Sequence, residues 1–128
     1  MKVLLDTSTF LWIVDSREKL SARAVDVFQA ADNDMYLSAA SSWELANKYA
    51  LRKLTLSQPP HQYVPLHREA HGILPLAIDE ESALVAARLP MLHKDPWDRM
   101  LIGQAVVHGL TILTPDPLIA RYTVRTLW

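Results

Sequence analysis

Apolar residues along the chain follow two patterns, short runs rich in Val, Ile and Leu and longer stretches of helical period. Their alternation is typical of repeated strand-helix units around a mostly parallel sheet. The short runs predict strands at residues 2–5, 35–37, 73–78 and 111–113, with a fifth at 123–127. Pro75 in the third run indicates an interrupted or edge strand, because proline has no backbone N–H to donate.

The longer stretches predict helices between these strands. Helices begin near Thr7 and after Ser21, and further helices cover about 40–51, 79–89 and 96–109, with Asp79 capping the first of the last two and Gly109 ending the other. Residues 57–65 are expected to be a stretch broken by prolines, followed by a short helix that ends at Gly72. No linker composition or internal repeat interrupts the pattern, which predicts one layered α/β domain.

Composition narrows the class of protein. The 128 residues are 50% hydrophobic and 21% charged, which excludes disordered and low-complexity classes. Because the net charge is −1, the protein as a whole does not attract nucleic acid, and any nucleic acid must be held by a local patch of positive charge. The absence of Cys excludes thiolate nucleophiles and thiolate metal sites, and three scattered Gly exclude a phosphate-binding glycine-rich loop.

No apolar run approaches the roughly 20 residues needed to cross a bilayer. The first apolar run, Val3 to Leu5, is stopped by Asp6, so it lacks the unbroken apolar core of a signal peptide. We therefore expect a cytoplasmic protein without a membrane segment.

Acidic residues follow the predicted strands or begin the helices behind them. Asp6 directly follows the first strand, and Glu44 lies about one turn into the helix after the second. Asp98 lies in the first turn of the helix before the fourth strand, and Asp116 follows that strand. Because ligands of open parallel sheets bind outside the carboxyl ends of the strands, we expect these four carboxylates to point toward one rim.

Helix capping competes with this interpretation. Asp6, Asp95 and Asp116 stand where a helix N-cap is favoured, and Asp98 suits the positive end of a helix dipole. Asp79 also follows a strand, and we assign it to capping alone. The joint occurrence of the acids, rather than any one of them, indicates a site.

Glu44 is the acid that capping explains least, because it lies among residues that should pack inward. Its i, i+4 spacing to Lys48, repeated from Lys48 to Arg52, still allows a solvated row of ion pairs. A buried carboxylate and an exposed ion-pair row therefore stay open as alternatives at this position.

Carboxylates gathered at one rim need a counter-charge. Two of them about 5 Å apart repel by about 3 kcal/mol at an effective dielectric of about 20, so several pairs would rival a domain's total stability of about 5 to 15 kcal/mol. With oxygen ligands, Mg²⁺ or Mn²⁺ fits best. Such an ion lowers the pKa of a bound water and neutralises a leaving oxygen, which suits phosphodiester hydrolysis.

Four segments place these acids in a distinctive context. They are the run from Val3 to Ser8, the helix that carries Glu44, the run His93-Lys94-Asp95-Pro96-Trp97-Asp98-Arg99-Met100-Leu101-Ile102 and the run Leu113-Thr114-Pro115-Asp116. Together they resemble a PIN domain, specifically the VapC-type ribonuclease toxins of bacterial toxin-antitoxin systems. The resemblance implies a PIN-like three-layer α/β/α fold with a mostly parallel central sheet of four to five strands, as a single PIN domain over residues 1–128.

The resemblance also implies a function. It implies a divalent-metal-dependent endoribonuclease that hydrolyses RNA phosphodiester bonds with a metal-activated water, as the toxin of a type II toxin-antitoxin pair. Asp6, Glu44, Asp98 and Asp116 would be its catalytic residues, with Asp6 and Asp98 as direct ligands of Mg²⁺ or Mn²⁺ and the other two acting partly through water. The expected partners are RNA, a small antitoxin protein and a second copy of the chain in a homodimer.

Residues beside the acids are candidates for supporting them or contacting substrate, namely Ser8, His93, Lys94, Asp95 and Arg99. Asp95 stays open between a helix cap and a site acid, and a structural role is favoured for His93. Relatives usually have Ala where this chain has Gly103, and a basic residue where it has Pro115. The missing phosphate contact would need a replacement from Lys94, Arg99, Lys48 or Arg52.

Other motifs are weaker. His67 and His71 are four residues apart, but Arg68 stands where a zinc protease requires Glu, so no zinc site is predicted. The four tryptophans fit core or dimer-interface anchors better than base-stacking platforms, which need a surrounding basic stripe; they are Trp12, Trp43, Trp97 and Trp128.

Two other classes of protein are alternatives. A receiver-like Mg²⁺-binding signalling domain has paired acids near its first strand and a Lys after a late strand, whereas Asp6 is followed by Thr-Ser-Thr and the fourth strand by Thr-Pro-Asp. The second is a non-catalytic α/β binding module whose acids only cap helices. Metal dependence separates that module from a nuclease.

Overall fold

Strands and helices alternate in the computed structural model, which describes residues 1–128, as the hydrophobic pattern predicts. The strands are β1 (Lys2–Leu5), β2 (Asp34–Ser38), β3 (Leu74–Leu76), β4 (Thr111–Leu113) and β5 (Thr126–Leu127). The helices are α1 (Thr7–Asp15), α2 (Ala22–Gln29), α3 (Ala39–Ala50), α4 (Pro60–Ala70), α5 (Glu80–Arg88) and α6 (Pro96–His108), with 3₁₀ turns at Arg17–Lys19 and Ile119–Arg121. None of these helices has the length and apolar character needed to cross a membrane.

All five strands form one parallel sheet in the order β3-β2-β1-β4-β5. This confirms the predicted α/β class. β3 lies at one edge, where Pro75 is tolerated because an edge strand has only one neighbour to hydrogen-bond. β1 lies in the middle, between β2 and β4.

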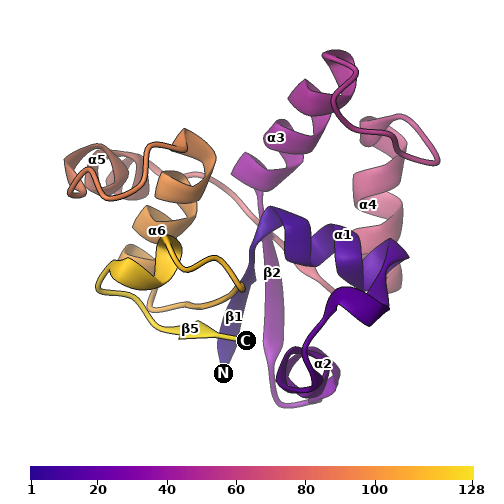
Figure 1. Cartoon of the computed structure of the whole chain (residues 1–128), viewed down its shortest axis with the longest axis horizontal. Helices are drawn as coiled ribbons and strands as arrows, with labels where there is room; N and C mark the ends of the chain where they lie inside the picture. The colour runs from indigo at the N-terminus through magenta and orange to yellow at the C-terminus, as the bar shows by residue number, and fades with distance from the viewer.

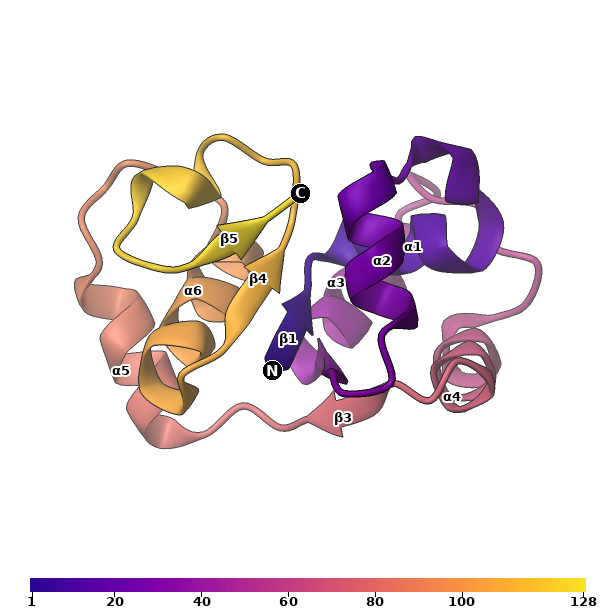
Figure 2. The ribbon, with the colours of Figure 1, turned by 90° about the horizontal axis from the view of Figure 1, so that it is seen from below.

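Helices cover both faces of the sheet. Val3 and Leu5 of β1 belong to a core cluster with residues of α1, α3 and α4, whereas Leu4 belongs to a second cluster with residues of α6 and β4. This alternation follows from the two-residue period of a strand. Figures 1 and 2 show the same layers, with α5 and α6 on one side of β1 and α1, α2 and α4 on the other.

The expected proline break at residues 57–65 is wrong in its second half, because α4 already begins at Pro60. Pro60 occupies the first turn, where its missing N–H has no helical partner to lose. Pro65 lies inside the helix with an exposed side chain, while Tyr63 and Val64 are buried against the core. Burial of these two neighbours compensates for the one backbone hydrogen bond that Pro65 removes.

The chain reverses its direction of travel across the sheet at β1. It first moves from β1 to β2 and β3, and then crosses through α5 and α6 to β4 on the other side of β1. In open parallel sheets such a reversal leaves a crevice at the carboxyl ends of the two strands. The segments after β1 and β4 therefore meet at this end, together with the first turns of α3 and α6.

Candidate metal centre

Four elements bring the predicted acids to the carboxyl end of the sheet. Asp6 lies between β1 and α1, Glu44 in α3, Asp98 in the first turn of α6, and Asp116 just after β4. The charges of Asp116 and Glu44 act on Asp6, and the charge of Asp6 acts on Asp98. The four carboxylates thus share one electrostatic environment although they come from distant parts of the sequence.

Asp6 occupies the N-cap position of α1 without capping it. Its side chain makes no hydrogen bond to the first turn. Instead, Asp6 Oδ2 accepts a hydrogen bond from the Thr114 hydroxyl at 2.7 Å, and the Thr114 hydroxyl accepts one from the Asp116 backbone N–H at 3.0 Å. Burial raises the pKa of Asp6, and the charges of Asp116 and Glu44 raise it further, while the bond from Thr114 opposes them. The capping interpretation is therefore wrong for Asp6.

Glu44 is buried, with 5% of its surface exposed, so the solvated ion-pair row is wrong at this residue. Its Oε1 accepts a hydrogen bond from the Thr7 hydroxyl at 2.7 Å, and the Ser41 hydroxyl lies 2.8 Å from that of Thr7. Its Oε2 pairs with the ammonium group of Lys48, one turn further along α3. Both oxygens of this carboxylate are thus held in fixed directions.

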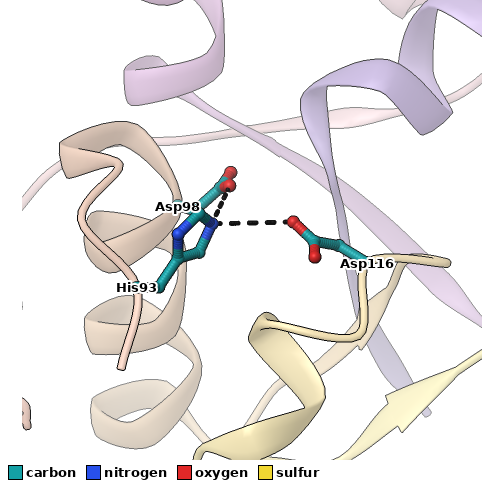
Figure 3. A group of neighbouring side chains, drawn as sticks. All are labelled: His93, Asp98 and Asp116. Carbon is teal, nitrogen blue, oxygen red and sulfur yellow. Dashed lines mark hydrogen bonds and ion pairs between the residues drawn. The ribbon is translucent and has the colours of Figure 1, made fainter. Parts of the chain in front are cut away.

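Asp98, Asp116 and His93 form the most closely spaced group of possible ligands (Figure 3), with one ligand atom from each lying within 4.8 Å of the others. The His93 Nε2 atom lies 2.7 Å from Asp98 Oδ2 and 3.6 Å from Asp116 Oδ2. Asp116 also accepts a hydrogen bond from the Leu118 backbone N–H through Oδ1, so only its other oxygen faces the group. The sequence favoured a structural role for His93, and it did not indicate that the imidazole lies between two of the predicted site acids, as it does in the structure.

The pKa of Asp98 is raised to about 7, first by burial and then by the charges of Asp6 and Asp95. The hydrogen bond from His93 opposes this shift without cancelling it. A carboxylate with this pKa gains from a nearby cation at neutral pH, because ionisation is otherwise costly. Perturbed carboxyl groups in a crevice are typical of functional sites.

Asp95 caps α6, which resolves its two alternatives in favour of the cap. Its Oδ1 accepts hydrogen bonds from the backbone N–H groups of Trp97 at 2.8 Å and of Asp98 at 3.3 Å. The cap fixes the first turn of α6 and thereby the direction of the Asp98 side chain. Its charge still raises the pKa of Asp98.

The other three candidates lie outside this network. Ser8 and Lys94 are exposed, and no side-chain hydrogen bond or ion pair involves them. Arg99 is buried, and its guanidinium donates to the backbone oxygens of Ala86, Leu89, Pro90 and His93 and to the Tyr122 hydroxyl. The structure places Arg99 in the scaffold beneath the site, where it does not face a substrate.

Sequence reasoning missed the hydroxyl groups that hold the acids. Thr7 and Thr114 are both buried, and each donates to one site carboxylate. A signal was present, because Thr7 directly follows Asp6 and Thr114 lies two residues before Asp116. Buried hydroxyls beside predicted acids are therefore candidates for orienting them.

The donor set fits a hard divalent cation. It consists of carboxylate oxygens and one imidazole, and the pKa values of Asp6 and Asp98 are raised by burial and by the charges of neighbouring carboxylates. Mg²⁺ and Mn²⁺ prefer such oxygen ligands, and the positive charge would relieve the repulsion that raises these pKa values. The residues present thus fit a metal ion of this kind.

Comparison with known proteins gives the same family throughout. The PIN domain family model matches residues 3–124. The chain is 29% identical to Ribonuclease VapC22 of Mycobacterium tuberculosis over 89% of its length and 86% of the relative's. It is 40% identical to Ribonuclease VapC16 of the same organism over 65 residues, which cover 48% of this chain and less than half, 46%, of that relative.

Solved structures agree in fold. VapBC2 from Rickettsia felis bound to a DNA fragment from its promoter aligns with a TM-score of 0.74 at 12% identity, over 99% of this chain and 98% of that one. VapBC-1 from nontypeable Haemophilus influenzae aligns with a TM-score of 0.66 at 16% identity, over 99% and 97%. With the family match over nearly the whole sequence and the acids gathered after β1 and β4, the chain belongs to the PIN domain family.

Proposed function

We propose that this chain is a divalent-metal-dependent endoribonuclease and the toxin of a type II toxin-antitoxin pair, acting in the cytoplasm as a single PIN domain over residues 1–128. The observation that carries the proposal is the convergence of Asp6, Glu44, Asp98 and Asp116 at one rim of the sheet, where burial and neighbouring carboxylate charges raise the pKa of Asp6 and Asp98. Its similarity to the mycobacterial VapC ribonucleases supports RNA as the substrate.

Asp6 and Asp98 are the proposed direct ligands of Mg²⁺ or Mn²⁺, as the resemblance to VapC-type toxins implies, and the raised pKa values of both carboxyl groups are compatible with a nearby cation. Glu44 and Asp116 act partly through water. When bound, the ion lowers the pKa of a water molecule and offsets the charge that builds on the leaving oxygen of the phosphodiester.

The protein's own groups keep these ligands in place. The Thr114 hydroxyl orients Asp6, and the Thr7 hydroxyl orients Glu44. The Asp95 cap fixes the turn that carries Asp98. Such hydrogen bonds to the ligands reduce the reorganisation needed when an ion binds, which is why partners of this kind commonly affect metal affinity by about 10- to 100-fold.

The proposed protein partners are a small antitoxin and a second copy of the chain. The solved structures of VapBC2 and VapBC-1, to which this fold is similar, support the antitoxin. For the homodimer, an apolar cleft between α3 and α6 offers aromatic anchors, since Trp43 is 64% exposed and its ring lies 4.8 Å from that of Trp97, edge to face. The cleft contains no lysine or arginine, which suits an apolar protein surface better than RNA; its residues are Ala40, Trp43, Asn47, Ile78, Pro96, Trp97 and Met100.

The substitution Asp98→Asn tests the function. Asn keeps the size of the side chain and removes its charge, so the metal-free variant should be at least as stable as the native protein. It should lose the thermal stabilisation by Mg²⁺ or Mn²⁺ and the cleavage of RNA. Normal RNA cleavage by this variant would refute the assignment of Asp98, and RNA cleavage by the native protein in EDTA would refute metal dependence.

A second experiment tests the biological role. Expression of the chain alone should arrest growth, and co-expression of the small protein encoded beside it should restore growth. Unchanged growth with folded, active nuclease present would refute the toxin role while leaving the ribonuclease assignment intact.

A further inference from the structure

The acid site poses an electrostatic problem for an RNA substrate. Asp95 adds a fifth carboxylate to the four proposed site acids, and one divalent ion offsets only two of these charges. An approaching phosphate diester is repelled by the remainder, because like charges a few ångströms apart interact strongly where water is partly excluded. The site therefore needs a protein cation at its entrance.

Two other basic groups near the site are engaged elsewhere, and a third is not held at the acids. Arg99 is buried, and its guanidinium is engaged with backbone oxygens on the inner side of α6. The imidazole of His93 is engaged with Asp98. Lys94 is exposed and forms no ion pair with any site acid.

Lys48 is the one lysine or arginine whose charged group contacts a site acid. Its ammonium pairs with Glu44 Oε2, and the charges of Asp95 and Asp98 on α6 also act on it and raise its pKa. The side chain is 44% exposed, whereas that of Glu44 is 7% exposed. The ammonium group thus lies at the boundary between the buried carboxylates and solvent, between α3 and the first turn of α6.

The position of Glu44 does not depend on Lys48 alone. Glu44 Oε1 is held by the Thr7 hydroxyl independently of the oxygen that pairs with Lys48. Lys48 can therefore turn toward a phosphate without releasing the carboxylate from its position. A flexible ammonium with three donors is suited to binding a phosphate as a point charge.

We propose that Lys48 binds a backbone phosphate of the RNA next to the cleaved bond, and that its pair with Glu44 holds it at the entrance of the site before RNA arrives. This inference deepens the proposed ribonuclease function and rests on it. Lys48 is a substrate-contacting residue in this view, rather than only a counter-ion that neutralises Glu44.

The salt dependence of RNA binding distinguishes the two roles. The variant Asp98→Asn, which should not cleave, is titrated with a fluorescent single-stranded RNA in EDTA at several salt concentrations, alone and combined with Lys48→Met. One lost phosphate contact should lower the slope of log K against log salt by about 0.7 and weaken binding at low salt about tenfold. Lys2→Met is the matched control, because Lys2 begins β1 at the opposite end of the sheet and is exposed.

Kinetics give a second measurement in the otherwise native protein. Lys48→Met should raise KM for RNA, and Lys48→Arg should recover part of the loss, because it keeps the positive charge. Lys48→Gln guards against a folding defect of the Met variant, and circular dichroism checks both.

Three outcomes separate the proposals. An unchanged salt slope and affinity in the Lys48 variants, while the parent binds RNA, would overturn the phosphate contact and leave the ribonuclease intact. A change in stability or metal affinity without a change in salt slope would assign Lys48 to neutralising Glu44 and overturn it equally. If the native chain neither binds nor cleaves RNA, the proposed function itself fails.

Discussion

Asp6 and Asp79 occupy equivalent places in the chain, each standing between a strand and the helix that follows it, yet their surroundings differ. Asp79 caps α5 through its side chain, is partly exposed, and has a pKa lowered chiefly by its hydrogen bond from Ser82. Asp6 leaves α1 uncapped, is buried, and has a raised pKa. Asp79 contributes to folding stability, whereas burial disfavours the ionised form of the Asp6 carboxylate, so its placement does not serve stability.

Position in the sheet explains the difference. Asp6 follows the central strand β1, so residues after β4 and residues of α3 surround it. Asp79 follows the edge strand β3, where its side chain meets its own helix and His108 at the end of α6. A capping acid and a site acid are therefore distinguished by which strand they follow, and not by their local sequence.

The largest expected effect comes from replacing each acid by Asn, an N-cap as good as Asp. Asp6→Asn should lower RNA cleavage by more than about 100-fold, because a proposed ion ligand is lost. Asp79→Asn should leave cleavage unchanged, since its side chain contacts Ser82 and His108 and none of the site acids. Rates measured side by side on one RNA substrate check this, and equal losses in both variants would contradict the comparison.

The pH dependence of stability should have opposite signs for the buried site acids and for the capping acid Asp79. The pKa of Asp98 is about 7 in the folded protein and near 3.8 unfolded, so the folded state binds the proton more tightly. In the absence of metal, the free energy of unfolding should therefore fall as pH rises through this interval, by up to about 4 kcal/mol. Urea unfolding in EDTA at several pH values measures this slope.

Asp98→Asn should reduce that slope to the part due to the raised pKa of Asp6, because the amide does not titrate, and saturating Mg²⁺ should flatten it by stabilising the ionised carboxylates. An unchanged slope in the variant would assign the pH dependence to groups other than Asp98.

A smaller effect is expected where α5 packs on α6. A Cβ atom at Gly103 would lie 2.6 Å from the Ser82 backbone oxygen and 3.0 Å from Ala86 Cβ. Gly103→Ala should therefore push α5 outward and destabilise the protein by about 1 to 3 kcal/mol. α5 is the helix that Asp79 caps, and it carries none of the site acids, so RNA cleavage well below the melting temperature should persist. Loss of cleavage would show that the contact between α5 and α6 positions Asp98.

The smallest effect is expected at the pair of Asp79 and His108, whose side chains lie 3.0 Å apart and are more than a third exposed. The pKa of Asp79 is lowered mainly by Ser82 and less by His108. Stability from this acid is therefore present above about pH 4 and lost as pH falls through its lowered pKa, opposite in direction to the contribution of Asp98.

His108→Gln should leave the loss of stability at low pH nearly unchanged, whereas Asp79→Ala should remove this loss. Thermal unfolding below and above about pH 4 compares the variants. A larger effect of His108→Gln would identify the ion pair, and not the cap, as the main interaction of Asp79.

Much of the fold could be predicted because it depends on local pattern. The alternation of short apolar runs with stretches of helical period predicted a mostly parallel sheet with helices between its strands, and the acids at strand ends predicted the rim where they meet. Pro75 correctly marked an edge strand. The helix through Pro65 could not be predicted, because burial of Tyr63 and Val64 in the assembled core outweighs the local signal.

The site was less predictable wherever a side chain depends on distant parts of the sequence. Asp6 fits a helix cap locally, and only the hydroxyl of Thr114, more than 100 residues away, directs it into the site. His93 and Arg99 lie in the same short run, yet one faces the acids and the other the interior. Spacing along a chain identifies candidate residues, whereas their direction follows from tertiary packing.

The inward guanidinium of Arg99 has a consequence for the placement of His93. It is bonded to four carbonyls between Ala86 and His93, a stretch in which α5 ends and no regular hydrogen-bond ladder continues. The Arg99 side chain thus supplies hydrogen bonds to the connection that carries His93, where no neighbouring strand supplies them. Loss of the Arg99 guanidinium would remove a hydrogen-bond partner from each of these carbonyls, so position 99 constrains the placement of His93 as well as the packing of the core.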